Sequence, residues 1–193
     1  MNCIIAGVGG QGTVLASKLI AAAAMESGRN VRTTETIGMA QRGGCVVSHV
    51  RIGTKIHSPL VPLNSAGVII AFEPAEAVRV LPFLAAGGLM IVCDSMIKPV
   101  TSSLSGDGYR AEDMIDYLKA HVANLVVIGG EQLLAACKST KVLNVALLGA
   151  AAESGVFPFD AATMENTVRS KTPERFSEMN LAAFAIGRRS YPK

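Results

Sequence analysis

The sequence predicts an α/β protein built in three layers, with a mainly parallel, Rossmann-like sheet, one antiparallel hairpin and a helical C-terminal region. Three observations lead to this fold class. The first 28 residues read as a strand, a glycine turn and a helix. Later β-branched apolar runs alternate with helical patterns, which is typical of a parallel sheet covered by helices on both faces. No strand pattern remains after residue 140.

The chain begins with a short apolar strand, about residues 2–6, that enters the segment Gly7-Val-Gly-Gly-Gln-Gly12 and continues as a helix over about residues 11–28. The spacing satisfies GxGxxG. We expect Gly7 to take the positive φ of a tight turn, Gly9 to let an anion approach the backbone, and Gly12 to let the helix pack close on the strand. A helix N-terminus presents free N–H groups and a positive dipole end, so the turn predicts a site for a phosphate or carboxylate.

A second glycine-rich segment follows the next predicted strand, residues 30–34. It reads Glu35-Thr-Ile-Gly-Met-Ala-Gln-Arg-Gly-Gly44, and its glycines disfavour the helix that a dinucleotide-binding unit would place here. Arg42 can hold a carboxylate or phosphate bidentately from this loop; an exposed arginine near a turn is the equally open alternative. Glu35 stands where an acidic residue bonds the ribose of NAD, about 20 positions after the first glycines. An independent NAD(P)-binding protein is therefore the alternative function.

The remaining elements follow from hydrophobic periodicity. Residues 45–52 alternate apolar and polar side chains, and we expect them to form the antiparallel hairpin with residues 54–59. Further strands are expected at 67–73, 88–94 and 124–129, and helices at 74–85, 111–120, 131–138, 141–154, 160–171 and 174–188. We therefore expect a single domain over residues 1–193, with an α/β core at 1–140 and a helical end at 141–193 packed on it.

Composition narrows the function classes. Charged residues make up 17% of the chain, below the roughly 25% usual for soluble domains, which suggests that a partner covers some surface. The net charge is +3 without a run of basic residues, so nucleic acid is not an expected ligand. The first strand leaves no room for a signal peptide, and the longest apolar stretch, residues 19–25, is too short to span a bilayer, so we expect a cytoplasmic protein.

The cysteines, the histidines and the segment 106–108 are each better explained by a structural role than by catalysis or metal binding. The four cysteines show no CxxC spacing, so we expect buried reduced thiols and no metal or iron–sulfur cluster in this chain. The three histidines lack the nucleophile and carboxylate of a catalytic triad, and His49 is expected to be packed. Gly106-Asp107-Gly108 resembles the opening of a thiamine-diphosphate motif, but polar residues precede it and Asn124 follows too closely. We expect a surface turn there.

The two glycine segments together identify a family. Gly-x-Gly-Gly-Gln-Gly at 7–12 and Glu-Thr-Ile-Gly-Met-Ala-Gln-Arg-Gly-Gly at 35–44 resemble the gamma-type subunit of the 2-oxoacid:ferredoxin oxidoreductases, and most closely the beta subunits of its indolepyruvate branch. The resemblance continues through Asn144-Val-Ala-Leu-Leu-Gly149, residues 155–158 and Asn180-Leu-Ala-Ala-Phe-Ala-Ile-Gly187. It covers nearly the whole chain.

The resemblance implies a reaction in which an aryl 2-oxoacid, coenzyme A (CoA) and oxidised ferredoxin give an acyl-CoA, CO₂ and reduced ferredoxin. It implies that thiamine diphosphate, Mg²⁺ and the iron–sulfur clusters lie on a larger partner subunit, with two copies of each subunit in the complex. This chain would hold no cofactor, would be inert alone and would contribute positioning and exclusion of water. A scaffold whose glycine turn is only structural is a third possibility.

The resemblance also implies which residues face the shared active site. They would bind an anion such as a CoA phosphate, or lie at the interface with the larger subunit. The residues that match the family's glycine segments are Gly7, Gly9, Gly10, Gln11, Gly12, Glu35, Gly38, Met39, Arg42, Gly43 and Gly44. Which 2-oxoacid is used, whether CoA touches this subunit, and whether Arg42 contacts substrate, cofactor or partner stay open.

Overall fold

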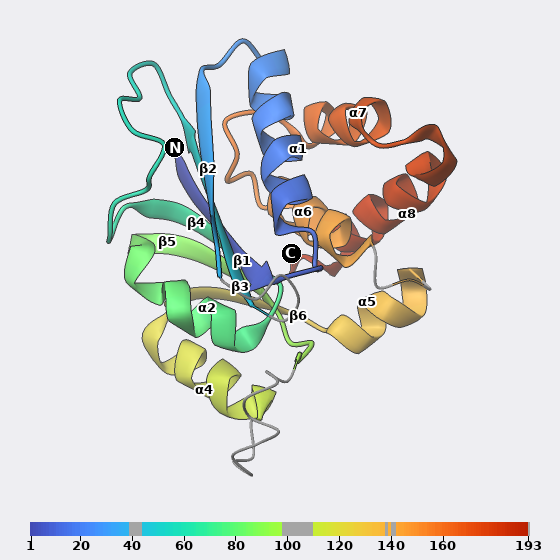
Figure 1. Ribbon diagram of the computed structural model, residues 1–193. Coiled ribbons are helices and arrows are strands. Elements are labelled where there is room, and N and C mark those ends of the chain that lie inside the picture. The colour runs from blue at the N-terminus through green and yellow to red at the C-terminus, as the bar shows by residue number, and fades with distance from the viewer. Residues whose placement is uncertain (39–43, 98–109, 138, 140–141, 193) are drawn as a thin grey trace.

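The computed structural model describes residues 1–38, 44–97, 110–137, 139 and 142–192. A six-stranded sheet with the order β2-β3-β1-β4-β5-β6 forms its centre (Figure 1). The strands are β1 (Asn2–Val8), β2 (Val31–Ile37), β3 (Cys45–Ile52), β4 (Ala66–Ala71), β5 (Leu84–Cys93) and β6 (Asn124–Ile128). β1, β4, β5 and β6 pair in parallel, which confirms the mainly parallel sheet.

β3 runs opposite to its two neighbours. It pairs antiparallel with β1 on one side and with β2 on the other. The predicted hairpin partner was therefore wrong, because residues 54–59 form no strand and β2 takes that place. Ser48, His49 and Val50 are all buried in β3, so both faces of this strand are covered. Such a strand belongs inside a sheet, with a neighbour on each edge, rather than at the outer edge of a hairpin.

Helices cover both faces of the sheet, which gives the predicted three layers (Figure 1). On one face, where Cys3 and Ile5 point, lie α1 (Thr13–Glu26), α5 (Gly130–Cys137), α6 (Leu143–Glu153), α7 (Ala161–Lys171) and α8 (Glu174–Ser190). On the other, where Ile4 and Ala6 point, lie α2 (Pro74–Val80) and α4 (Ala111–His121). The alternation of adjacent β1 residues between two cores is the period of a strand buried on both faces.

The segment after β4 departs from its predicted bounds. The expected helix over 74–85 ends at Val80, and a short 3₁₀ turn, η1 (Leu81–Phe83), follows. Pro82 contributes to the early end, because proline has no backbone N–H with which to continue the hydrogen bonds of the helix. β5 therefore begins at Leu84, four residues before its predicted start at 88.

Two glycines let α8 cross close over α6. A Cβ on Gly149 would overlap the carbonyl oxygen of Phe184, and a Cβ on Gly187 would overlap that of Ala146. Every residue of α6 from Asn144 to Ala152 is buried. α6 is thus packed between the sheet and α8. This packing limits the movement of its N-terminal end. Among the helices of the described residues, none has the length and hydrophobicity to cross a membrane.

Candidate functional site

The turn between β1 and α1 differs from the prediction in which glycines take left-handed backbone. Gly10 has φ 103° and Gly12 has φ 84°, whereas Gly7 lies within β1 and has no positive φ. Glycine is needed at position 7 because a side chain there would have no room. A Cβ there would lie 2.8 Å from Gln11 Oε1 and 3.3 Å from the Cβ of Phe72. The role predicted for Gly7 was wrong because the chain turns later, after Val8.

The side chain of Gln11 folds back into the turn. The backbone N–H of Val8 donates to Gln11 Oε1 at 2.7 Å, and Gln11 Nε2 donates to the carbonyl oxygen of Phe72 at 3.0 Å. Phe72 directly follows β4, so one amide joins the carboxyl ends of β1 and β4. The helices that follow these two strands, α1 and α2, lie on opposite faces of the sheet. Open α/β sheets bind ligands at the point where neighbouring strands connect to opposite faces in this way.

The two glycine segments of the sequence are in direct contact. The backbone N–H of Gly9 donates to the carbonyl oxygen of Gly44 at 2.8 Å. The N–H of Gly38, within the second segment, donates at 2.9 Å to the carbonyl oxygen of Cys45, the residue that directly follows that segment. The Gly9 N–H is therefore already bonded to Gly44, and the approach of an anion to the backbone at Gly9 stays a prediction. Met39, Arg42 and Gly43 lie outside the described residues.

The first turn of α1 still offers donors. Its first intrahelical bond runs from the N–H of Ala16 to the carbonyl oxygen of Gly12. No side chain of the described residues caps this end, and no acidic residue lies in the first turn. The leading N–H groups of α1 therefore keep their positive potential, which is the property that attracts phosphates and carboxylates.

Asn144, near the start of α6, contacts the last glycine of the turn. Its side chain is 3% exposed, and Nδ2 donates to the carbonyl oxygen of Gly12 at 3.3 Å. A Cβ on Gly12 would overlap this Nδ2. Gly12 thus makes room for α6, not for packing of α1 on the strand as predicted. One sequence feature could have pointed to Asn144, namely its place at the head of the apolar segment 144–149.

Glu35 lies on β2 and faces α1. Ser17 Oγ of α1 lies 3.2 Å from Glu35 Oε1, and Ser48 of β3 is directly opposite Glu35 in the sheet. In a dinucleotide-binding unit the second strand neighbours the first, so its terminal carboxylate reaches the sugar. Here β3 separates β2 from β1, which places two strand spacings, about 9–10 Å, between them. This arrangement does not support the NAD(P) alternative.

His49 is packed, as the sequence predicts. It is 5% exposed, accepts a hydrogen bond at Nδ1 from the N–H of Val61 at 3.1 Å, and meets the ring of Phe83 edge to face. Burial lowers the pKa of His49. Burial also raises the pKa of the Cys3 thiol to about 12, which keeps it protonated.

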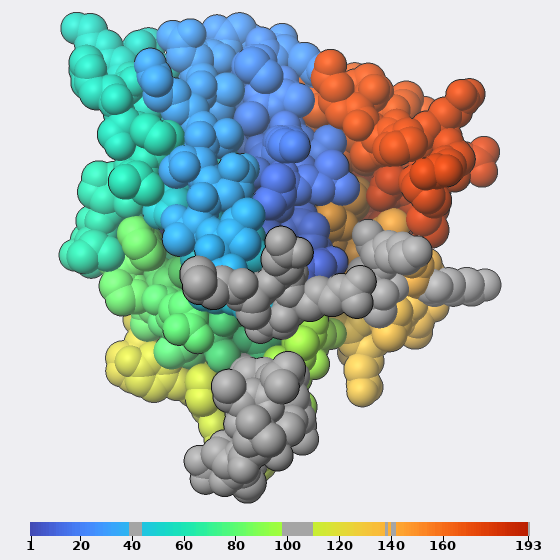
Figure 2. All heavy atoms as spheres, viewed as in Figure 1, coloured from blue at the N-terminus to red at the C-terminus, as the bar shows by residue number. Residues whose placement is uncertain are grey.

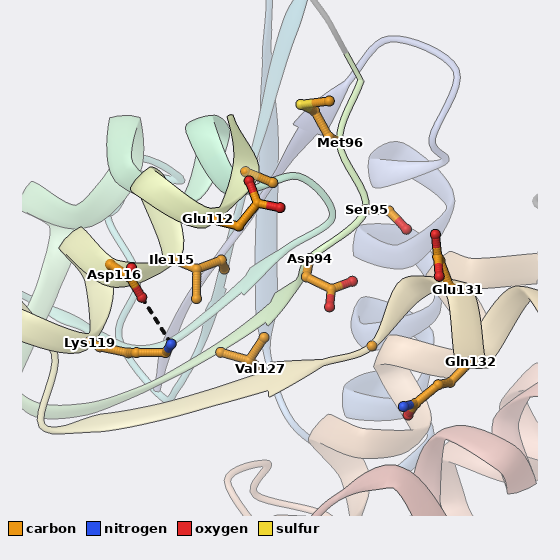
Figure 3. A pocket seen from close by; sticks show the side chains of 12 residues that line it. Asp94, Ser95, Met96, Glu112, Ile115, Asp116, Lys119, Val127, Glu131 and Gln132 are labelled. Carbon is orange, nitrogen blue, oxygen red and sulfur yellow. Dashed lines mark hydrogen bonds and ion pairs between the residues drawn. The ribbon is translucent and has the colours of Figure 1, made fainter. Parts of the chain in front are cut away.

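A cleft of about 990 Å³ lies at the carboxyl ends of β5 and β6 (Figure 3). Four carboxylates surround it, those of Asp94, Glu112, Asp116 and Glu131, and Lys119 pairs with Asp116 at 3.0 Å. Among the residues that the structure describes, none of the sequence-predicted site residues lines the cleft. Its net negative lining repels phosphate, so the anion site predicted by the sequence is better matched by the turn before α1.

Comparisons with known proteins agree with this architecture. The family described as pyruvate ferredoxin/flavodoxin oxidoreductase matches residues 2–190. The indolepyruvate oxidoreductase subunit IorB of Pyrococcus horikoshii is 34% identical, over 96% of this chain and 93% of its own.

Two solved structures share the fold. The gamma subunit of a keto/oxoacid ferredoxin oxidoreductase from Geobacter sulfurreducens has a TM-score of 0.67 at 24% identity, covering 98% of this chain and 96% of its own. The 2-oxoglutarate:ferredoxin oxidoreductase of Magnetococcus marinus, solved with 2-oxoglutarate, CoA and succinyl-CoA bound, has a TM-score of 0.71 at 21% identity. There the match covers 98% of this chain and 30% of that longer one. The family match over residues 2–190 and the identity to IorB together show that this chain belongs to the pyruvate ferredoxin/flavodoxin oxidoreductase family.

Proposed function

We propose that this chain is the smaller subunit of a 2-oxoacid:ferredoxin oxidoreductase that acts on an aryl 2-oxoacid such as indolepyruvate. The complex converts the 2-oxoacid, CoA and oxidised ferredoxin to an acyl-CoA, CO₂ and reduced ferredoxin. The observation that carries this proposal is the 34% identity to an indolepyruvate oxidoreductase subunit over 96% of the chain.

In this proposal the chain binds and orients reactants. The leading N–H groups of α1, together with the left-handed Gly10 and Gly12, hold a phosphate of CoA or the carboxylate of the 2-oxoacid. A structure of the same fold contains CoA, which supports this choice of ligand class. Arg42 adds a positive charge from the segment that Gly44 ties to the turn. The contribution is positioning, which can lower a barrier without bond chemistry by this chain.

The cofactors belong to the larger subunit in this proposal. Within the described residues, no group of three or more histidines, cysteines and carboxylates is placed to hold a metal ion. Cys3, Cys45, Cys93 and Cys137 lie on β1, β3, β5 and α5, and such dispersed thiols do not match the shared ligand loop of an iron–sulfur cluster. Thiamine diphosphate on the larger subunit would supply the carbanion chemistry, and the iron–sulfur clusters of that subunit would carry the electrons to ferredoxin.

In this proposal the larger subunit docks on this chain at the carboxyl ends of the strands. Exposed apolar side chains lie at this end: Ile37, the last residue of β2, is 60% exposed, Leu15 in the first turn of α1 is 39% exposed, and Met96 and Ile97 after β5 are 38% and 39% exposed. β2 also forms an open surface of the molecule (Figure 2). Burial of these side chains would stabilise the complex and exclude water from the turn.

We propose that the complex contains two copies of each subunit.

Co-expression with a candidate larger subunit tests the function. We expect the two chains to co-purify and to reduce a viologen dye when a 2-oxoacid and CoA are both present. Each chain alone should be inactive, and a panel of aryl and aliphatic 2-oxoacids should identify the substrate. Activity of this chain alone, or an active larger subunit that gains nothing from this chain, would contradict the proposal.

A further inference from the structure

We propose that Asn144 is a positioning residue, which holds the glycine turn from the helical C-terminal region and so orients the N–H groups of α1. This inference rests on the function proposed above, in which those N–H groups bind an anion. Its basis is the hydrogen bond from Asn144 Nδ2 to the carbonyl oxygen of Gly12, between residues far apart in the sequence.

The geometry requires an amide at position 144. Asn144 Oδ1 accepts from the N–H of Val145 at 2.9 Å, which leaves Nδ2 to face the carbonyl oxygen of Gly12. An aspartate could keep the bond to Val145 but would set a negative oxygen against the Gly12 carbonyl. Since Asn144 is 3% exposed, bulk water does not readily replace the lost donor.

Position 12 is matched to this contact. Gly12 has φ 84°, and the space that its Cβ would fill holds Asn144 Nδ2. Asn144 has little freedom to retreat, because α6 is buried and is crossed closely by α8 at Gly149. Through this contact, the position of α6 determines where Gly12, the residue directly before α1, can lie.

Three bonds hold the turn from three directions. The Gly9 N–H is bonded to Gly44, Gln11 Nε2 to Phe72, and the Gly12 carbonyl to Asn144. The first two fix the strand side of the turn. The bond from Asn144 acts where the chain enters α1, so its loss should change the direction of the leading N–H groups more than the stability of the fold.

The variants Asn144→Asp and Asn144→Ala test this in the reconstituted complex. Asn144→Asp suits the first turn of α6, because a carboxylate is favourable at a helix N-terminus, so the helix itself is preserved. We expect kcat/KM to fall about ten-fold or more for the reactant whose anion the turn binds, CoA or the 2-oxoacid, with the KM for the other reactant within about two-fold of the wild-type value. The control is Asn180→Asp, a buried asparagine on α8, which should leave both parameters unchanged.

Hydrogen exchange in the isolated chain gives a second readout that needs no activity. The hydrogen-bonded amides of Gly9, Gln11 and Ala16 at the turn should exchange about ten-fold faster in Asn144→Asp, while β4 amides keep their protection. If Asn144→Asp does not fold, Asn144→Ala carries both measurements.

The outcomes separate the two proposals. A wild-type complex without 2-oxoacid-dependent activity overturns the proposed function, and hydrogen exchange then decides the role of Asn144. An active wild-type complex whose Asn144 variants match it in kcat/KM for both CoA and the 2-oxoacid overturns the role of Asn144. So does an equal loss in Asn180→Asp, or unchanged exchange at the turn amides.

Discussion

The backbone N–H of Gly9 donates a hydrogen bond of 2.8 Å to the carbonyl oxygen of Gly44, so the two glycine segments of the chain form one structure. The bond links the turn before α1 to the end of the segment that begins on β2 and contains Arg42. The turn at which we propose that an anion binds is therefore joined to the second segment at Gly44, which a reading of either motif alone does not reveal.

Gln11 should be the most important side chain for the stability of the turn. Gln11→Ala leaves the N–H of Val8 and the carbonyl oxygen of Phe72 without their partner, and each buried unpaired group costs about 1–3 kcal/mol. We expect the free energy of unfolding to fall by about 2–3 kcal/mol in urea denaturation. Gln132→Ala, at an exposed glutamine, should change it by less than about 0.5 kcal/mol; equal effects would refute this role for Gln11.

Gly12→Ala should cost more than the same change at Gly28. Both positions have positive φ, so both pay the strain of left-handed backbone, about 1–2 kcal/mol. A Cβ at Gly28 meets nothing within 4 Å, whereas at Gly12 it overlaps Asn144 Nδ2. We expect Gly12→Ala to lower the free energy of unfolding by about 2 kcal/mol more than Gly28→Ala.

A double-mutant cycle checks the cause of that difference. In the background Asn144→Ala, the overlapping amide is gone and the extra cost of Gly12→Ala should largely disappear. Additive effects of the two substitutions would show that the cost at Gly12 is backbone strain alone.

His49 should make the protein less stable in mild acid. Its folded-state pKa is lowered by burial from the ordinary 6.5, and its Nδ1 accepts from the N–H of Val61, so protonation removes this bond. The unfolded chain binds the proton more readily, and the stability that neutral His49 provides is complete above pH 6.5 and is lost as the pH falls towards the lower folded-state pKa. Thermal melts at about pH 7.5 and about pH 5.5 measure the loss.

The matched variants for this prediction are His49→Gln and His57→Gln. His49→Gln removes the titrating group, so the difference in melting temperature between the two pH values should shrink. His57 is exposed, and its replacement should leave the difference as in the wild type. A pH response unaltered by His49→Gln would rule out His49 as its source.

Arg42 should act on catalysis in the complex without affecting the fold. If its guanidinium holds a carboxylate or phosphate, Arg42→Ala should raise the KM for CoA or for the 2-oxoacid by about ten-fold, and Arg42→Lys should recover only part of the loss because an ammonium cannot bind bidentately. Unchanged kinetic constants in the reconstituted complex would remove Arg42 from the site. Which KM changes identifies the ligand.

Much of the fold could be predicted because its signals are local. The apolar runs that became β4, β5 and β6 are continuous and bounded by glycine, asparagine or proline, and the helices from α4 to α8 lie within a few residues of their predicted ranges. The glycine segments were enough to indicate the family, which the match over residues 2–190 confirms. Element type and order depend on side-chain periodicity and turn residues, and these are written in short stretches of sequence.

The tertiary structure alone decided the neighbours of each element. Nothing local in residues 45–52 shows that β3 lies between β2 and β1, and nothing near Gly12 shows that Asn144 fills the space beside it. These outcomes depend on which distant groups satisfy buried backbone donors and acceptors once the layers have packed. They depend on the whole chain, because a hydrogen bond across the sheet or between helices contributes to the free energy of folding only when both partners are buried together.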